Sequence, residues 1–421
     1  MNITLNPSST EDYRRFLAIK RLPRYAFRGR MASVPNEYAH LIDAGDAPLA
    51  HAEYTPSARA FDYQRDIAAI AIRKQKFAVF ADCGLGKTLI MLEFVRHAAS
   101  VLPDGKRLLI VSPLMVVPQT IAEAQRFYGD ELPIEQVAAK NLQAWLNGDG
   151  SRIGITNYDA IHDELEAGDL GALILDESSM LKSMYGKWGQ ALIQLGRGLE
   201  WKLCLTGTPA PNDRIEYGNH AVFLDQFPTL NAFLAKFFVN LGQTDNRWEL
   251  KPHALEPFYR ALSHWCIFLT NPGTYGWKDN AGELPPIHFH VHHVETTAEQ
   301  DAITRHETGE LFASTFGGIA SRSTLARIAK GTYQGQRIET NKYAVVADLL
   351  SQWPTESTII WCLYNDEQDT LAAMLPEAGN IDGSTPVERR LELIEEFKAG
   401  TRRILISKAK VTIYMAHQGN L

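Results

Sequence analysis

The sequence has few cysteines, no long apolar run and no excess of positive charge. Its 4 cysteines among 421 residues form no Cys-x-x-Cys pair, which excludes a disulfide framework and suits a reducing compartment. No apolar run reaches the length of a membrane span, and the N-terminus lacks the apolar core of a secretory signal. The formal charge of −7 excludes a basic coat over the whole surface. We therefore expect a cytoplasmic protein with no membrane partner, in which any contact with nucleic acid is a local patch.

What remains is a globular composition, 45% hydrophobic and 22% charged, long enough for two or three domains. Helix and strand patterns alternate from about residue 56 to residue 225, which predicts an α/β fold with a parallel sheet. We expect a helix over residues 61–73 and strands around Val79, Ile110, Ile155, Ile174 and Leu203. In the second half we expect helices over 341–352, 366–375 and 387–398, and strands over 358–363 and 403–407.

The strongest local pattern is a strand, a tight turn and a helix around Lys87. Apolar residues 77–80 lead into Gly84-Leu85-Gly86, and Lys87-Thr88 opens an apolar helix. This context is typical of a phosphate-binding loop, in which backbone N–H groups and the helix N-terminus hold phosphate oxygens. Lys87 would place a positive charge at the β- and γ-phosphates, and the Thr88 hydroxyl would bind Mg²⁺. Ala81 replaces the first glycine of the full pattern, so a chance glycine-containing turn is the alternative.

Two later apolar runs also end in polar groups. Residues 172–175 lead into Asp176-Glu177, and residues 202–205 lead into Thr206-Gly207-Thr208. At the tip of a strand in a nucleotide site, the Asp holds Mg²⁺ and the Glu deprotonates the attacking water. Each segment alone is an ordinary strand that ends at the surface. The three segments in this order are much more specific.

With these segments in place, the sequence resembles the superfamily II helicases, and within them the Swi/Snf-type DNA translocases. The further matching segments are Tyr63-Gln64, Leu109–Pro113, Ile155–Tyr158, Leu181–Ser183, Pro209–Asn212, Leu284–Pro286, Thr297–Gln300, Ile381–Thr385 and Glu388–Arg390. Leu181–Ser183 and Pro209–Asn212 favour the Swi/Snf branch over the RNA-acting DEAD-box branch. The match covers roughly residues 55–410.

The resemblance implies two RecA-like parallel-sheet lobes in tandem, with a helical insertion between them. It implies ATP and Mg²⁺ as cofactors and DNA as partner, with duplex DNA preferred to single-stranded DNA. The implied function is an ATP-dependent translocase or helicase-like ATPase that moves on DNA or remodels it, in a phage or bacterial protein. The alternatives are a hydrolysis-poor remnant that binds nucleotide and DNA, and an RNA helicase.

The resemblance also assigns roles to individual residues. The nucleotide-binding residues are Gln64, which reads adenine, and Cys83, Gly84, Leu85, Gly86, Lys87, Thr88 and Leu89. Catalysis falls to Lys87, Asp176 and Glu177, with Thr88 and Asp176 as ligands of Mg²⁺. Thr206, Gly207 and Thr208 couple the nucleotide to nucleic acid, which is contacted by Ser112, Pro113, Thr156, Asn157, Tyr158, Asp382 and Gly383.

We predict four parts: a basic arm (1–55), a first lobe (56–225), a helical insertion (226–285) and a second lobe (286–421). The arm carries Arg14, Arg15, Lys20, Arg21, Arg24, Arg28 and Arg30 among aromatic residues. It either seats a phosphate backbone or covers the first lobe. The aromatic residues of the insertion are expected to form a small core in preference to a base-stacking platform.

Two further expectations concern the second lobe. The alternating histidines 288, 290 and 292 lie on one face of an expected first strand of that lobe, and a metal site is the alternative. The family would follow Ser407-Lys408 with a glycine-rich segment and then an arginine-bearing one, and residues 409–421 hold neither. The resemblance therefore predicts an incomplete second lobe and slow turnover.

Overall fold

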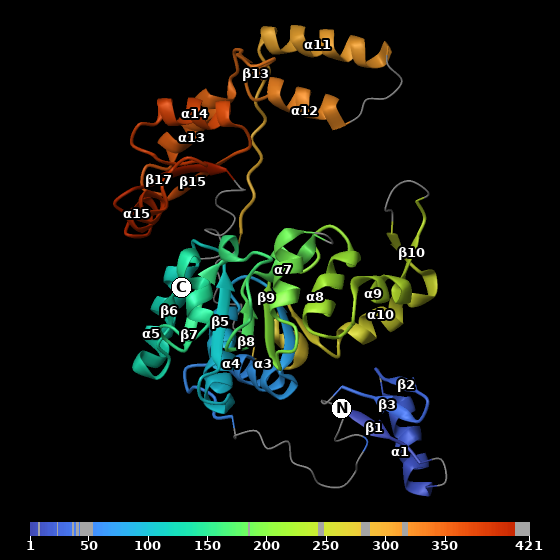
Figure 1. Cartoon of the computed structure of the whole chain (residues 1–421). Coiled ribbons are helices and arrows are strands. Elements are labelled where there is room, and N and C mark those ends of the chain that lie inside the picture. Colours follow the sequence, from blue (N-terminus) through green and yellow to red (C-terminus); the bar gives the residue numbers. More distant parts are fainter. Residues whose placement is uncertain are drawn as a thin grey trace. The chain divides into compact units, whose positions relative to one another are not determined.

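The computed structural model describes residues 1–6, 9–22, 24–35, 38, 42, 54–183, 186–242, 248–278, 287–313 and 319–408. The chain divides into two compact units, residues 1–284 and 285–421 (Figure 1). Across the described part of the chain, the helices are too short or too polar to cross a membrane.

The first unit is built on a seven-stranded parallel sheet with the strand order β12-β4-β9-β8-β5-β7-β6. The strands are β4 (Lys76–Ala81), β5 (Arg107–Ser112), β6 (Glu135–Gln136), β7 (Ile153–Asn157), β8 (Leu170–Leu175), β9 (Trp201–Thr206) and β12 (Cys266–Leu269). A parallel sheet is covered on both faces, which is why these strands read as continuous apolar runs. The five strands predicted for the first lobe are confirmed.

Helices cover both faces of this sheet. They are α3 (Asp62–Lys74), α4 (Lys87–Val101), α5 (Val117–Tyr128), α6 (Leu142–Leu146), α7 (Lys187–Leu195), α8 (Tyr217–Phe223), α9 (Leu230–Phe237) and α10 (Leu255–Leu262). Phe77 and Val79 point into a core that contains residues of α3, α4 and α5, whereas Ala78 and Phe80 point into a core with residues of α6 to α10. Because side chains alternate along a strand, the sheet forms the middle of three layers.

The segment predicted as a helical insertion supplies both a small aromatic core and the strand β12. Phe233, Phe237 and Phe258 are fully buried and contact one another edge to face, which confirms the core prediction. A hairpin of β10 (Phe238–Asn240) and β11 (Trp248–Leu250) packs beside α9. Strand β12 then pairs with β4, so the sheet of the first unit extends to Leu269.

The N-terminal arm has its own small fold. Strands β1 (Asn2–Thr4), β2 (Ala26–Arg28) and β3 (Met31–Ser33) form an antiparallel sheet beside α1 (Thr10–Arg21), with a core that includes Ile19 and Val34. The Arg24 guanidinium lies 5.9 Å from the centre of the Phe227 ring. This contact favours the covering role, and binding of a phosphate backbone stays a prediction. The side chains of Arg14 and Arg21 lie outside the described residues.

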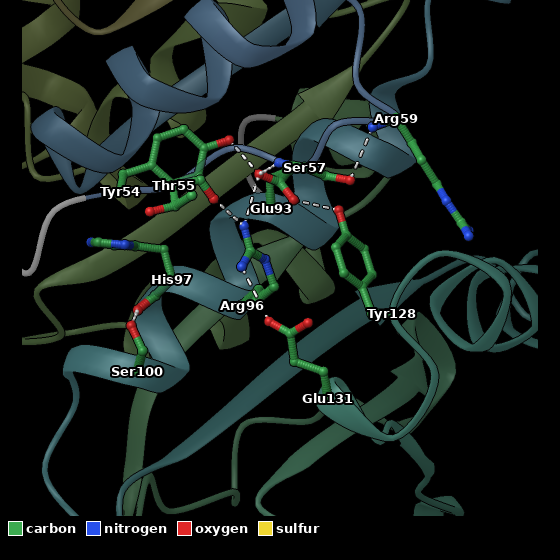
Figure 2. A network of polar contacts seen from close by, with 10 residues as sticks. All are labelled: Tyr54, Thr55, Ser57, Arg59, Glu93, Arg96, His97, Ser100, Tyr128 and Glu131. Carbon is green, nitrogen blue, oxygen red and sulfur yellow. Dashed lines mark hydrogen bonds and ion pairs between the residues drawn. The ribbon is translucent and has the colours of Figure 1, made fainter.

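The segment that leads into α3 is pinned to α4 by a buried carboxylate, Glu93 (Figure 2). Its side chain is 1% exposed and accepts hydrogen bonds from both Tyr54 and Tyr128 hydroxyls. The backbone N–H of Ser57 and the Arg96 guanidinium each donate to Oε2 at 3.2 Å. A buried carboxylate with this many donors is well satisfied, so it ties three separate parts of the unit together.

We expect replacement of Glu93 by glutamine to destabilise the first unit in a pH-dependent way. Burial acts to raise the pKa of Glu93, but the hydrogen bonds from Tyr128, Tyr54 and Arg96 outweigh it, and the pKa lies below its ordinary value of 4.5. The stabilisation is therefore present above pH 4.5 and is lost as the pH falls through the lower pKa of the folded state. The free energy of unfolding should fall by about 1–3 kcal/mol at pH 7. Thermal melting of Glu93→Gln and wild type at pH 7 and in acid measures both effects.

The control for Glu93 is Glu131→Gln. Glu131 bonds the same Arg96, but its side chain is 59% exposed, so its removal should change the stability by less than about 1 kcal/mol. Equal losses in the two variants, or a Glu93→Gln effect that does not shrink in acid, would contradict the assignment.

The second unit holds a three-stranded parallel sheet with the order β15-β17-β16. Its elements are α11 (Ala298–Ala313), α12 (Ile319–Ile328), β13 (Thr332–Tyr333), β14 (Gln336–Arg337), α13 (Lys342–Gln352), β15 (Thr358–Cys362), α14 (Asn365–Met374), β16 (Gly379–Ile381), α15 (Val387–Lys398) and β17 (Ile404–Lys408). The helices and strands predicted between residues 341 and 407 are confirmed, and with them the α/β fold of two parallel-sheet lobes in tandem.

One predicted strand of the second unit is wrong. Residues 287–297 form neither helix nor strand, and the side chains of residues 287–293 on both faces are exposed. An alternating pattern makes a strand only where a neighbouring strand pairs with it and one face is buried, and neither condition is met here. Within the described residues, no group of three or more His, Cys, Asp or Glu side chains is placed to hold a metal ion.

Candidate active site

The turn between β4 and α4 has the backbone shape of a phosphate-binding loop. Gly84 and Gly86 have left-handed φ angles of +80° and +68°. The conformation of Gly86 requires glycine, and a β-carbon there would lie 2.1 Å from Nε2 of Gln64 and would displace that amide. Helix α4 begins at the next residue, Lys87, and the first N–H groups of a helix have no partners within it. The turn can therefore hold an anion, and the residues present fit the phosphates of a nucleotide.

The Lys87 ammonium lies at this turn. Its Nζ donates to the backbone oxygens of Ala81 at 2.9 Å and Asp82 at 3.3 Å. These backbone oxygens are neutral acceptors, and they hold the Lys87 side chain at the turn. A bound phosphate would offer it a negatively charged acceptor instead. A β-carbon at Gly207 would lie 3.3 Å from the Ala81 oxygen and 3.7 Å from Lys87 Nζ, so the predicted coupling segment touches the phosphate loop. Partial desolvation raises the pKa of the adjacent Cys83 thiol, but the side chain is exposed, so the structure does not support a packing role.

Asp176 is a buried carboxylate at the end of β8. It is 7% exposed, and its Oδ2 accepts a hydrogen bond of 2.9 Å from the Ser112 hydroxyl. Burial, with the charge of Glu177 beside it, raises the pKa of Asp176 from 3.8 to about 6. A buried carboxylate that is costly to ionise is stabilised by a cation, and Mg²⁺ prefers such oxygen ligands. The residue fits its predicted role as a magnesium ligand.

Glu177 is held in an unusual backbone conformation. Its φ and ψ are both 50°, the left-handed region, which costs a non-glycine residue of order 1–2 kcal/mol. The Thr206 hydroxyl donates to Glu177 Oε2 at 3.1 Å and accepts from the Thr208 N–H at 3.1 Å. The Thr206–Thr208 segment thus orients the predicted base directly.

Gln64, the predicted reader of adenine, packs against the phosphate loop. It is 4% exposed, its Oε1 accepts from the Phe61 N–H at 2.9 Å, and its Nε2 lies 3.4 Å from the Leu85 oxygen. The neighbouring Tyr63 hydroxyl donates to the same oxygen at 3.1 Å. To read a base, Gln64 has to exchange one of these contacts for the base edge, and this role stays a prediction.

Several residues predicted to face nucleic acid point into the first unit. The Tyr158 hydroxyl donates to the Asp176 backbone oxygen at 2.6 Å, and the Thr156 hydroxyl donates to Val137 at 2.8 Å. Pro113 is also buried, and Asn157 is half-buried. Ser112 and Tyr158 therefore both bond to Asp176, which links the ends of β5 and β7 to the magnesium ligand. Contact of this set with nucleic acid stays a prediction.

The remaining predicted nucleic-acid residues, Asp382 and Gly383, lie in the second unit. Asp382 Oδ1 accepts from the N–H groups of Ser384 at 2.8 Å and Thr385 at 2.9 Å. Hydrogen bonds from Ser384 and Thr385 hold the pKa of Asp382 below its usual range. The carboxylate closes the turn after β16, and the exposed Gly383 leaves the backbone of that turn accessible.

Two buried polar residues of α8 were missed by the sequence patterns. Asn219 donates from Nδ2 to the backbone oxygens of Leu181 at 2.8 Å and Ser183 at 2.7 Å. His220 Nε2 lies 3.1 Å from the Ser178 hydroxyl. An Asn-His pair within a short helix has no recognisable spacing, so only the fold brings these residues to the segment behind Glu177.

The chain was compared with protein families, curated proteins and solved structures. A family model described as SNF2-related domain matches residues 72–342. Among curated proteins, the chain is 28% identical over 203 residues to protein p41 of Acyrthosiphon pisum secondary endosymbiont phage 1, which covers 44% of each chain. The chain thus spans less than half the length of that relative.

Two solved structures from Sulfolobus solfataricus also match. The SWI2/SNF2 ATPase core in complex with dsDNA is 18% identical, with a TM-score of 0.45, over 85% of this chain and 80% of that one. The SWI2/SNF2 ATPase core domain is 19% identical, with a TM-score of 0.41, over 86% of this chain and 78% of that one.

Proposed function

This chain belongs to the SNF2-related domain family, and on that basis we propose that it is an ATP-dependent DNA translocase that uses hydrolysis to move along duplex DNA or to remodel it. The observation that carries the proposal is the meeting of three segments at one edge of the first sheet. The phosphate loop, Asp176-Glu177 and Thr206–Thr208 follow β4, β8 and β9, and β9 lies between the other two strands. Ligands of parallel α/β sheets bind at this edge.

Each residue at that edge has a distinct task in the proposed reaction. Lys87 and the N–H groups at the start of α4 bind the β- and γ-phosphates, and Thr88 and Asp176 hold Mg²⁺. When bound, Mg²⁺ neutralises charge that develops on the phosphates. Glu177, oriented by Thr206, accepts a proton from the attacking water.

Coupling to DNA is proposed to run through the ends of β5 and β7. Ser112 and Tyr158 lie at these ends and both bond to Asp176. If DNA binding shifts the end of β5 or of β7, it therefore changes the hydrogen bonds that Asp176 accepts. The partner is DNA because the SNF2-related family and the segments after Asp176-Glu177 and Thr206–Thr208 both point to the Swi/Snf branch.

Steady-state ATP hydrolysis measured alone, with duplex DNA, with single-stranded DNA and with RNA tests the proposal. We expect Mg²⁺-dependent turnover that duplex DNA stimulates several-fold more than the other two. Displacement of a third strand from a DNA triplex then tests movement. Stimulation by RNA alone would indicate an RNA helicase. Nucleotide binding without turnover under any condition would indicate a hydrolysis-poor remnant.

A further inference from the structure

We propose that His220 and Asn219 of α8 are positioning residues for the catalytic base, because they fix the backbone that follows Glu177. The inference rests on the function proposed above. It adds to the reaction two residues that act through the segment 178–183.

The Ser178–His220 contact is fully buried. Both side chains are 0% exposed, and burial lowers the pKa of His220 to about 4, so the ring is neutral at physiological pH. Its Nδ1 lies 3.4 Å from the backbone oxygen of Glu216. Nε2 lies 3.1 Å from the Ser178 hydroxyl, within hydrogen-bonding distance.

Asn219 holds the other end of the same segment. Residues Ser178–Lys182 form a 3-10 turn directly after Glu177. The Asn219 amide donates to the backbone oxygens of Leu181 and Ser183, so adjacent residues of one helix grip the turn at its start and at its end. A β-carbon at Gly189 would lie 3.3 Å from Asn219 Nδ2, so α7 also confines the amide.

Glu177 needs such support because its left-handed backbone is strained. A strained residue keeps its conformation only where the surrounding structure fixes it. On its N-terminal side the chain is held by β8, and on its C-terminal side the His220 and Asn219 side chains of α8 contact it, together with Cys204 of β9, which bonds to the Ser178 hydroxyl. Without the grip of α8, Glu177 can relax toward ordinary φ values, and its carboxylate then leaves the direction set by Thr206.

Helix α8 also binds the loop that follows Thr206–Thr208. The Glu216 carboxylate, at the N-terminus of α8, accepts from the Asn212 N–H at 3.2 Å and from its Nδ2 at 2.7 Å. A movement of that loop can therefore change the orientation of Glu177 in two ways. It acts directly through the Thr206 hydroxyl, and indirectly through α8 and its contact with Ser178. Helix α8 makes the geometry of the base depend on the state of the coupling segment.

The test is a double-mutant cycle in single-turnover hydrolysis with excess protein. Ser178→Ala, which removes one hydroxyl and little volume, and His220→Ala are each combined with Glu177→Gln. In the wild-type background we expect each to lower the rate constant roughly 10- to 100-fold, because small displacements of catalytic groups have effects of this size. The nucleotide Kd should change less than about two-fold. In the Glu177→Gln background the same substitutions should have no further effect, since they act through Glu177.

A matched control is Cys266→Ala, which shortens a buried side chain of β12. It should lower the melting temperature about as much as Ser178→Ala does, but leave the rate unchanged. His220→Gln, which keeps a polar group near Nε2, should recover part of the rate.

If Ser178→Ala or His220→Ala lowers the rate by the same factor in the Glu177→Gln background as in the wild type, the two residues do not act through Glu177. That result would show a merely structural role and overturn the inference. If Glu177→Gln loses turnover while Ser178→Ala and His220→Ala do not, the inference falls and the proposed function stands. If Glu177→Gln itself keeps the wild-type rate, Glu177 is not the catalytic base, and the proposed function fails.

Discussion

Replacement of Lys87 by alanine is expected to abolish measurable ATP turnover, with a loss of at least about 10²–10³-fold. Transfer of a phosphoryl group concentrates negative charge on the phosphate oxygens, and the protein lowers the barrier chiefly by placing positive charge there. Lys87 is the first residue of α4, and its ammonium lies within hydrogen-bonding distance of the carbonyls at the end of β4. No other Lys or Arg of the described residues bonds to these carbonyls of the loop.

Hydrolysis at saturating ATP and nucleotide binding are to be measured in parallel for Lys87→Ala. The control is Lys140→Ala, which removes an exposed lysine of the same unit away from the loop and should leave turnover unchanged. Melting of both variants should resemble the wild type, since Lys87 bonds only to carbonyls at a solvent-accessible turn. Turnover of Lys87→Ala at the wild-type level would remove the loop from the reaction.

Replacement of Glu177 by glutamine should lower the rate of hydrolysis by about 10²–10⁴-fold while nucleotide binding persists. The amide keeps the size of the side chain and an oxygen for the Thr206 hydroxyl, but it cannot accept a proton from water. The losses of Lys87→Ala and Glu177→Gln therefore differ in kind, because only the lysine also contributes to binding of the phosphates.

Single-turnover hydrolysis and binding of a fluorescent ATP analogue separate the two effects. Glu164→Gln, the same chemical change at an exposed position of the first unit, serves as control and should behave as wild type. Loss of binding in Glu177→Gln would instead indicate that Glu177 is a metal ligand or a structural residue.

The strands and helices that carry the site were predictable because their signals are local. The apolar run before Gly84 and the helix pattern after Lys87 define β4 and α4 without reference to the rest of the chain. The same holds for β8, which reads as a buried strand because both of its faces are covered. At the carboxyl ends of such strands the polar residues stand out, so Asp176 and Glu177 could be named from the sequence.

Features that depend on spatial neighbours were not predictable. Tyr158 belongs to a segment expected to face nucleic acid, and only the sheet order, with β5 between β7 and β8, brings its hydroxyl to the Asp176 backbone oxygen. His220 carries no local pattern, and its contact with Ser178 joins residues far apart in the chain. The alternating residues 287–293 have the period of a strand but lack a partner, which the sequence does not reveal.

The pairing of β12 with β4 has a consequence for how the protein is made. During synthesis β4 and the phosphate loop leave the ribosome long before Cys266–Leu269. Until then, the backbone groups on the β12 side of β4 have no strand to pair with. The Leu269 oxygen also accepts from the Asp82 N–H at 2.9 Å, at the first residue of the loop. The residues of the aromatic core, 226–265, precede β12 in the chain, so they are synthesised before that bond can form. We therefore expect the phosphate loop to reach its final backbone arrangement only after Cys266–Leu269 has been synthesised and has paired with β4.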